Sequence, residues 1–129
     1  MNLRPLLTVN AVLATGHGLG FIIAPSLLLS LYQIAGSAGA ALMGQLFGAE
    51  LLVVAIICWK ARDFTNPQAI TAVVLAGLIP NAVGTVISLL AILNGAIGVM
   101  GWVAVAIYVG LSAGYLAAQV QSGRIEGAA

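Results

Sequence analysis

Four long apolar stretches decide what this chain can fold into. They cover about residues 6–31, 40–59, 70–93 and 97–118. Each is long enough for a helix that crosses a membrane, since such a helix needs about 20 apolar residues. Only 5% of the residues are charged, against roughly 25% in a soluble domain. We therefore predict an all-α fold, a four-helix transmembrane bundle that forms a single domain over residues 1–129.

Prolines and capping residues mark the expected helix boundaries. Pro25 removes a backbone donor late in the first stretch and is expected to kink or end that helix. Thr65 or Asn66 could cap the third helix, with Pro67 in its first turn, where the missing N–H costs nothing. Pro80 is expected to kink the third helix near its middle.

The basic residues predict the orientation of the chain. All four lie on segments that would share one side of a membrane, namely Arg4, Lys60, Arg62 and Arg124. The other two loops contain none. Because cytoplasmic segments carry an excess of Lys and Arg, we expect both termini in the cytoplasm.

Each expected helix carries a polar side chain near its middle. The midpoints fall near positions 18, 50, 82 and 107, and beside them stand His17, Glu50, Asn81 and Tyr108. An ionised group at this depth costs about 2.5–3.5 kcal/mol on insertion scales. We expect Glu50 to be protonated and hydrogen-bonded to one of the other three, or ionised beside a protonated His17. The four residues form a candidate ligand-binding or proton-linked cluster.

Several uses fit this cluster. It could be structural, with interhelical hydrogen bonds of about 0.6 kcal/mol each fixing the helix register. It could instead hold a hydrophobic small molecule, a quinone-type ring or a pigment, or carry protons. The glycines beside His17 would admit a macrocycle ligated by imidazole. The cofactor, if any, stays unknown at this point.

Small residues predict close packing between the helices. Glycines recur with a spacing of four residues, which lets helix backbones approach closely in lipid. The pairs are Gly16 with Gly20, Gly44 with Gly48, and Gly110 with Gly114.

Other residue patterns argue against several functional classes. The chain has no G-x-S-x-G, H-E-x-x-H or P-loop motif, so hydrolytic chemistry has little support. No nucleophile accompanies a Glu50–His17 acid–base pair, and we expect a protein that is not an enzyme. With one histidine and one cysteine, Cys58, we expect no metal site. A net charge of +1 without a basic cluster argues against nucleic acid as a partner.

Two local patterns resemble a known family. These are G-A-E-L-L at positions 48–52 and W-K-A-R at positions 59–62. Together with the four spans they resemble the DoxX-like group of small bacterial membrane proteins. The resemblance covers the whole chain in architecture, but only Gly48, Glu50 and Leu51 in local pattern. His17 and the Pro–Asn pair at positions 80–81 match no motif of that group.

The resemblance implies an accessory protein of the bacterial plasma (inner) membrane, since some members accompany oxidoreductases. We therefore expect a non-catalytic accessory or interaction subunit that holds a hydrophobic small molecule at the mid-membrane cluster. Its partners would be the lipid bilayer and a membrane protein or further copies of the chain. The alternative is a small proton-coupled transporter that works as an oligomer through Glu50.

Overall fold

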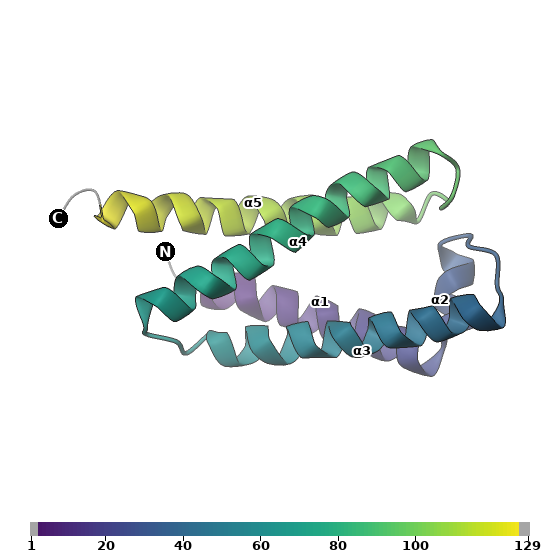
Figure 1. Ribbon diagram of the computed structural model, residues 1–129, viewed down its shortest axis with the longest axis horizontal. Helices are drawn as coiled ribbons and strands as arrows, with labels where there is room; N and C mark the ends of the chain where they lie inside the picture. The colour runs from purple at the N-terminus through teal and green to yellow at the C-terminus, as the bar shows by residue number, and fades with distance from the viewer. Residues whose placement is uncertain (1–2, 127–129) are drawn as a thin grey trace.

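The computed structural model describes residues 3–126, with side chains described as far as residue 120, and this part of the chain is all-helical. Figure 1 shows five helices, α1 (Arg4–Ile23), α2 (Pro25–Leu31), α3 (Ala38–Ala61), α4 (Pro67–Leu93) and α5 (Gly101–Glu126). Four of them, α1, α3, α4 and α5, are long and apolar enough to cross a membrane. The prediction of an all-α chain with four such helices is confirmed.

The first apolar stretch is divided at Pro25. Ala24 leaves helical geometry, with φ −135° and ψ 59°, and Pro25 begins α2. At the first position of a helix the missing N–H of proline costs nothing. The single helix over residues 6–31 is therefore wrong, although the expectation that Pro25 would end it is confirmed.

The start of α4 follows its capping residue. The Asn66 side chain accepts hydrogen bonds from the backbone N–H groups of Gln68 (2.9 Å) and Ala69 (3.2 Å), with Pro67 next in the chain. Of the two predicted caps, the structure therefore uses Asn66. The predicted start at residue 70 is three residues late. α4 continues through Pro80 as one helix.

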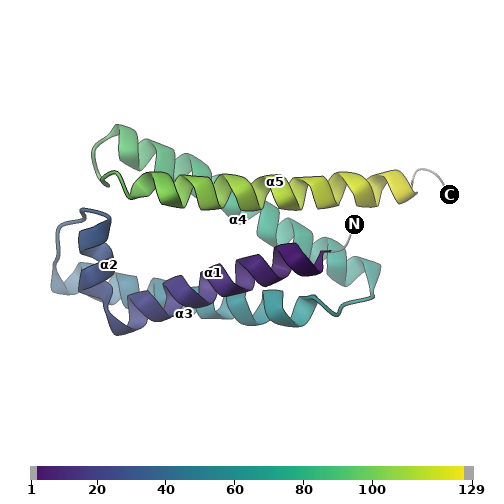
Figure 2. The same ribbon diagram turned by 180° about the vertical axis from the view of Figure 1, so that it is seen from behind.

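The long helices pack in two pairs. Figures 1 and 2 show α1 lying along α3, and α4 lying along α5, with much less contact between the pairs. In the first pair the backbones meet at Gly18 and Gly48. A Cβ on Gly48 would lie 2.7 Å from the carbonyl oxygen of Gly18, so only glycine fits there.

In the second pair, tyrosine rings of α5 pack against glycines of α4. A Cβ on Gly77 would overlap the Tyr115 ring, and one on Gly84 would lie 2.9 Å from the Tyr108 ring. The two glycine–tyrosine contacts are therefore seven residues apart on each helix, a spacing that returns to the same helix face.

The predicted glycine pairs are correct only in part. A Cβ on Gly44 or Gly48 would crowd α1, whereas Gly16 and Gly110 have no neighbouring atom within 4 Å of that position. The interhelical contact in α1 belongs to Gly18, which the spacing rule did not select. Spacing alone gives no information on which face of a helix meets its neighbour.

Hydrogen bonds between segments far apart in the chain lie at both ends of the molecule, and those at one end join the two helix pairs. At the end that holds the N-terminal segment, the 62–66 loop and the end of α5, the Arg4 side chain bonds to the Asp63 carboxylate and to the Arg62 carbonyl. At the other end, the backbone N–H of Gly98 donates to the carbonyl of Tyr32 over 2.8 Å. This second bond joins the loop before α5 to the segment after α2 and so links the two helix pairs, whereas the Arg4 contacts tie α1 to the loop that follows α3.

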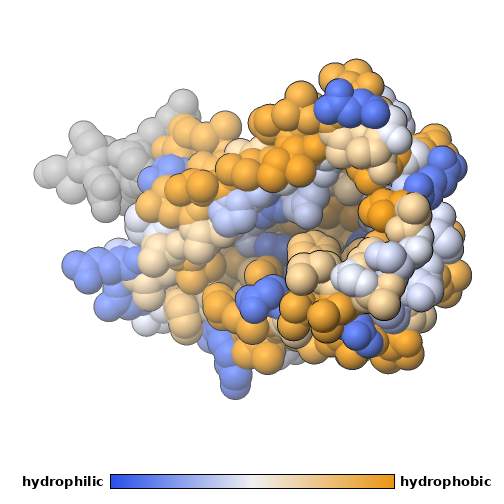
Figure 3. Space-filling model, turned by 45° about the vertical axis from the view of Figure 1, so that its right-hand side comes forward, coloured by the Kyte–Doolittle hydropathy of each residue, from blue (hydrophilic) through white to orange (hydrophobic). Residues whose placement is uncertain are grey.

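The outer surface is mainly apolar. Large hydrophobic side chains remain exposed along every long helix, including Ile23, Ile56, Ile87 and Val109. On the face shown in Figure 3, apolar residues in orange surround a hollow with paler and blue residues. A surface of this kind fits a lipid environment better than water.

Candidate functional site: a polar-lined cavity between the helix pairs

A buried polar contact joins the helix pairs near the charged end. The Tyr115 side chain is fully buried, and its hydroxyl accepts a hydrogen bond from the Asn10 amide over 2.8 Å. The Cys58 sulfur lies 3.8 Å from the same oxygen. We call Asn10, Cys58 and Tyr115 the junction. It links α1, α3 and α5, and it is surrounded by buried apolar residues such as Leu7, Val74 and Leu111.

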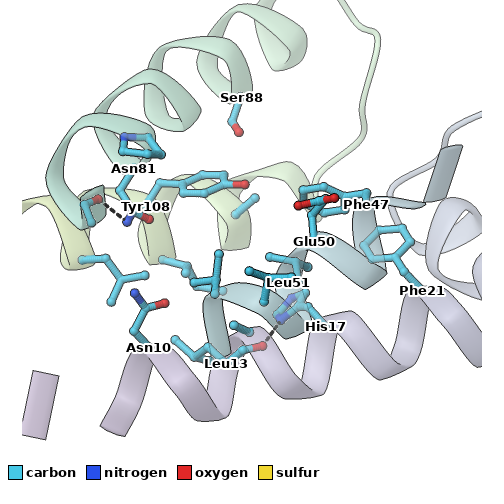
Figure 4. Close-up of a pocket in the computed structure, with 18 of the residues that line it drawn as sticks. Asn10, Leu13, His17, Phe21, Phe47, Glu50, Leu51, Asn81, Ser88 and Tyr108 are labelled. Carbon is cyan, nitrogen blue, oxygen red and sulfur yellow. Dashed lines mark hydrogen bonds between the residues drawn. The ribbon is translucent and has the colours of Figure 1, made fainter. Parts of the chain in front are cut away.

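The helix pairs form a partly open cavity of about 840 Å³ between them, and the three junction residues are part of its lining. Its lining is mostly apolar and comes from all five helices and from the α2–α3 and α4–α5 connections. Figure 4 shows polar side chains from α1, α3, α4 and α5 pointing into this space. The volume lies within the range of roughly 300–1,000 Å³ that is common for small-molecule sites.

All four residues of the predicted cluster line this cavity, namely His17, Glu50, Asn81 and Tyr108. They come from α1, α3, α4 and α5 in that order. Ser88 of α4 also lines it, and so does Tyr32, which follows α2. The structure thus brings together residues that lie up to 91 positions apart in the chain.

The expected hydrogen bonds within the cluster are wrong, because two of its members bond to their own helices. His17 Nδ1 lies 3.1 Å from the Leu13 carbonyl oxygen, and the Asn81 amide donates to the Gly77 carbonyl over 2.6 Å. A carbonyl can only accept, so Nδ1 of His17 carries the proton in this contact. In the neutral ring Nε2 is then an acceptor.

The other two members have no hydrogen-bond partner within the described part of the chain. Glu50 is exposed to the cavity, and Tyr108 is half-buried with its hydroxyl directed toward the side of the cavity where Glu50 lies (Figure 4). The bonds expected for Glu50 with the rest of the cluster are therefore not formed: Asn81 and Tyr108 belong to the other helix pair, and His17 on the neighbouring α1 bonds to its own helix. These two groups are available to a molecule in the cavity.

The junction is a feature that the sequence did not predict. Asn10 and Tyr115 each lie on the same helical stripe as a predicted site residue, His17 and Tyr108 respectively. Their stripes are visible in the sequence, but their pairing needs the crossing of α1 over α5. The third member, Cys58, is buried, which suits a small apolar side chain.

Within the described residues, no group of three or more His, Cys, Asp or Glu side chains is placed to hold a metal ion. The cavity instead offers a carboxyl, an imidazole nitrogen, hydroxyls and an amide oxygen on apolar walls. Such a set can orient an organic molecule through a few hydrogen bonds and one charge. No protein-family model, curated protein or solved structure matches this chain.

Proposed function

We propose that this chain is a multi-pass protein of the plasma (inner) membrane, a four-helix transmembrane bundle with both termini in the cytoplasm. Support comes from the four apolar helices and from the placement of the described basic side chains Arg4, Lys60 and Arg62 at one end. The positive-inside tendency assigns that end to the cytoplasm.

Cysteine labelling tests this orientation. In a Cys58→Ala background, we expect Gly36→Cys to react with an impermeant thiol reagent added to intact cells. Phe64→Cys should react only after the membrane is permeabilised. Labelling of position 64 from outside, with position 36 protected, would reverse the orientation.

We further propose that the protein is a non-catalytic accessory or interaction subunit that holds a hydrophobic small molecule between its helix pairs. The observation that carries this proposal is the cavity of about 840 Å³, whose mostly apolar walls carry at least one polar side chain from each long helix. A structural cluster would bond its polar groups to one another, as the junction does. Glu50 and Tyr108 have no such bonds within the described chain.

The test is to reduce the cavity without disturbing the fold. Ala104 of α5 lines the cavity, whereas Ala106, two residues further on, is exposed and does not line it. In the protein purified in a mild non-ionic detergent, we expect Ala104→Leu to lose co-purifying small molecules from an organic extract. The matched variant Ala106→Leu should keep them. Equal extracts from both variants and the parent would refute the proposal.

A second candidate function is proton-coupled transport by an oligomer, with Glu50 as the titrating group. It is favoured by the position of Glu50, which is exposed to the cavity and has no hydrogen-bond partner among the described residues. In liposomes that contain a pH-sensitive dye, protein-dependent proton flux should be lost in Glu50→Gln. Flux that is equal in the parent and the variant would exclude this candidate. The resemblance to the DoxX-like group stays a prediction.

A further inference from the structure

The distribution of charge around the cavity indicates which ligands it can accept. We propose that the cavity binds a hydrophobic organic cation, such as an apolar amine or a quaternary onium ion, with Glu50 as its counter-ion. This inference rests on the proposed ligand-holding function and specifies the chemical class of the ligand.

The basic side chains of the described region lie away from Glu50. Arg4 pairs with Asp63, and Arg62 lies 3.4 Å from the centre of the Trp59 ring and bonds to the Trp59 carbonyl. Lys60 is exposed at the same end, and no described Lys or Arg lines the cavity. No described lysine or arginine side chain therefore lies beside the Glu50 carboxyl.

The only imidazole in the cavity is already engaged. His17 Nδ1 lies 3.1 Å from the Leu13 carbonyl oxygen of its own helix. Among the described residues the ring makes no hydrogen bond or ion pair with Glu50. The remaining ionisable groups in the lining are Tyr32, Tyr108, Tyr115 and Cys58, which are neutral in their protonated forms.

An ionised carboxylate among apolar walls needs a partner of opposite charge. Removing an unpaired charge from water is costly, and a nearby opposite charge offsets that cost. A cationic ligand supplies such a charge, a neutral ligand supplies none, and an anion is repelled. Charge complementarity at Glu50 thus selects the cation among ligands of equal size and shape.

Aromatic rings close to Glu50 favour the same class. Phe47 lies three positions before Glu50, on the same helix face, and its ring meets the Phe21 ring edge to face at a centroid distance of 5.4 Å. Both rings line the cavity, as Tyr108 does from the opposite wall (Figure 4). The faces of aromatic rings attract organic cations. The mostly apolar lining then accommodates the hydrophobic substituents that surround the charge.

The experiment compares probes that differ mainly in charge. Tetraphenylphosphonium and tetraphenylborate have nearly the same shape and opposite charges, and triphenylphosphine oxide is a neutral relative. Binding to the full chain in non-ionic detergent micelles is measured by equilibrium dialysis near neutral pH, with protein-free micelles as the blank. We expect saturable binding of the phosphonium that is at least about tenfold tighter than that of the borate.

Two substitutions that each remove one carboxylate show which carboxylate binds the cation. Glu50→Gln should weaken phosphonium binding at least about tenfold, because it removes one partner of a desolvated charge pair. Asp63→Asn removes the same charge at the far end and should leave the affinity unchanged. Glu50→Asp keeps the carboxylate and should retain preference for the cation. Binding of the neutral oxide by Glu50→Gln shows that the variant is folded.

The ways in which the proposal can fail are distinguishable. If the neutral oxide binds and Ala104→Leu abolishes its binding, but the borate binds as tightly as the phosphonium, the cavity holds ligands and the cation proposal is wrong. The cation proposal is also wrong if Glu50→Gln binds the phosphonium as tightly as the parent does. If none of the three probes binds saturably, the ligand-holding function fails as well.

Discussion

Two tyrosines of α5, seven positions apart, sit over two glycines of α4 with the same spacing, yet their surroundings differ. Tyr115 over Gly77 is fully buried and accepts a hydrogen bond from Asn10. Tyr108 over Gly84 is half-buried, and its hydroxyl has no partner among the described residues. The contact within the pair is the same, so the difference lies in what the other helix pair brings. Both tyrosines line the cavity, but Asn10 of α1 bonds to the Tyr115 hydroxyl, whereas no described residue bonds to the Tyr108 hydroxyl.

The largest effect expected from this comparison is the loss of the Tyr115 ring. Tyr115→Ala should lower the free energy of unfolding by about 2–3 kcal/mol, less than the ~3–5 kcal/mol typical of aqueous cores because lipid replaces the hydrophobic contribution. Tyr108→Ala should cost clearly less. Unfolding in mixed micelles with increasing SDS measures both. Equal costs would remove the distinction between junction and cavity.

The second largest loss of stability is expected when a methyl group is added where the Tyr115 ring packs. Gly77→Ala places a Cβ against the Tyr115 ring and should destabilise the protein by about 1–2 kcal/mol. Gly110→Ala is the matched control on α5, since no atom lies within 4 Å of its Cβ position. That variant should be neutral or gain up to about 1 kcal/mol from helix propensity. The same SDS titration would contradict the packing if Gly77→Ala were as harmless as the control.

Removing only the hydroxyl groups gives a smaller and sharper contrast. Tyr115→Phe leaves the buried Asn10 amide without its acceptor and should cost about 1 kcal/mol. Tyr108→Phe should leave stability unchanged, because no described residue bonds to that hydroxyl. A cost for Tyr108→Phe equal to that for Tyr115→Phe would place a hydrogen bond where the structure has none among its described residues.

The smallest effect is expected at the charged end, outside the membrane-spanning segments. Arg4 holds the pKa of Asp63 below its ordinary value of 3.8. A lowered pKa in the folded state stabilises the protein above the ordinary value, and this contribution is lost as the pH falls through the folded pKa. The melting temperature of the parent should exceed that of Asp63→Asn near pH 6, and the difference should vanish in strong acid. A difference that grows in acid would contradict the pairing.

The long helices could be predicted from sequence because they depend on local properties. Runs of apolar residues and the Asn66–Pro67 start are read within a few positions of the chain. The depth of His17, Glu50, Asn81 and Tyr108 also follows from counting along each run, and all four reach one cavity. Equal depth in the membrane, however, does not fix the distance between side chains on different helices. The hydrogen bonds expected around Glu50 needed helix crossings, which depend on contacts such as Gly18 with Gly48.

The division at Pro25 and the Asn10–Tyr115 bond also depend on contacts between distant segments, which the local sequence does not reveal. A proline in an apolar run fits a kink, a stop or a new start, and the choice depends on where the following segment can pack. Asn10 has no near neighbour in sequence that identifies Tyr115, which lies 105 positions away. Such a pairing becomes visible only when both helix pairs are in place.

The central claim is that the Glu50 carboxyl faces the cavity between the helix pairs and not the surrounding acyl chains. Dicyclohexylcarbodiimide, an apolar reagent for protonated carboxyls, tests it directly when the modified peptides are identified by mass spectrometry. The account predicts modification at Glu50 that is strongly reduced in Ala104→Leu and unchanged in Ala106→Leu. Modification at the same rate in the parent and both variants would show a carboxyl open to lipid and would contradict the claim.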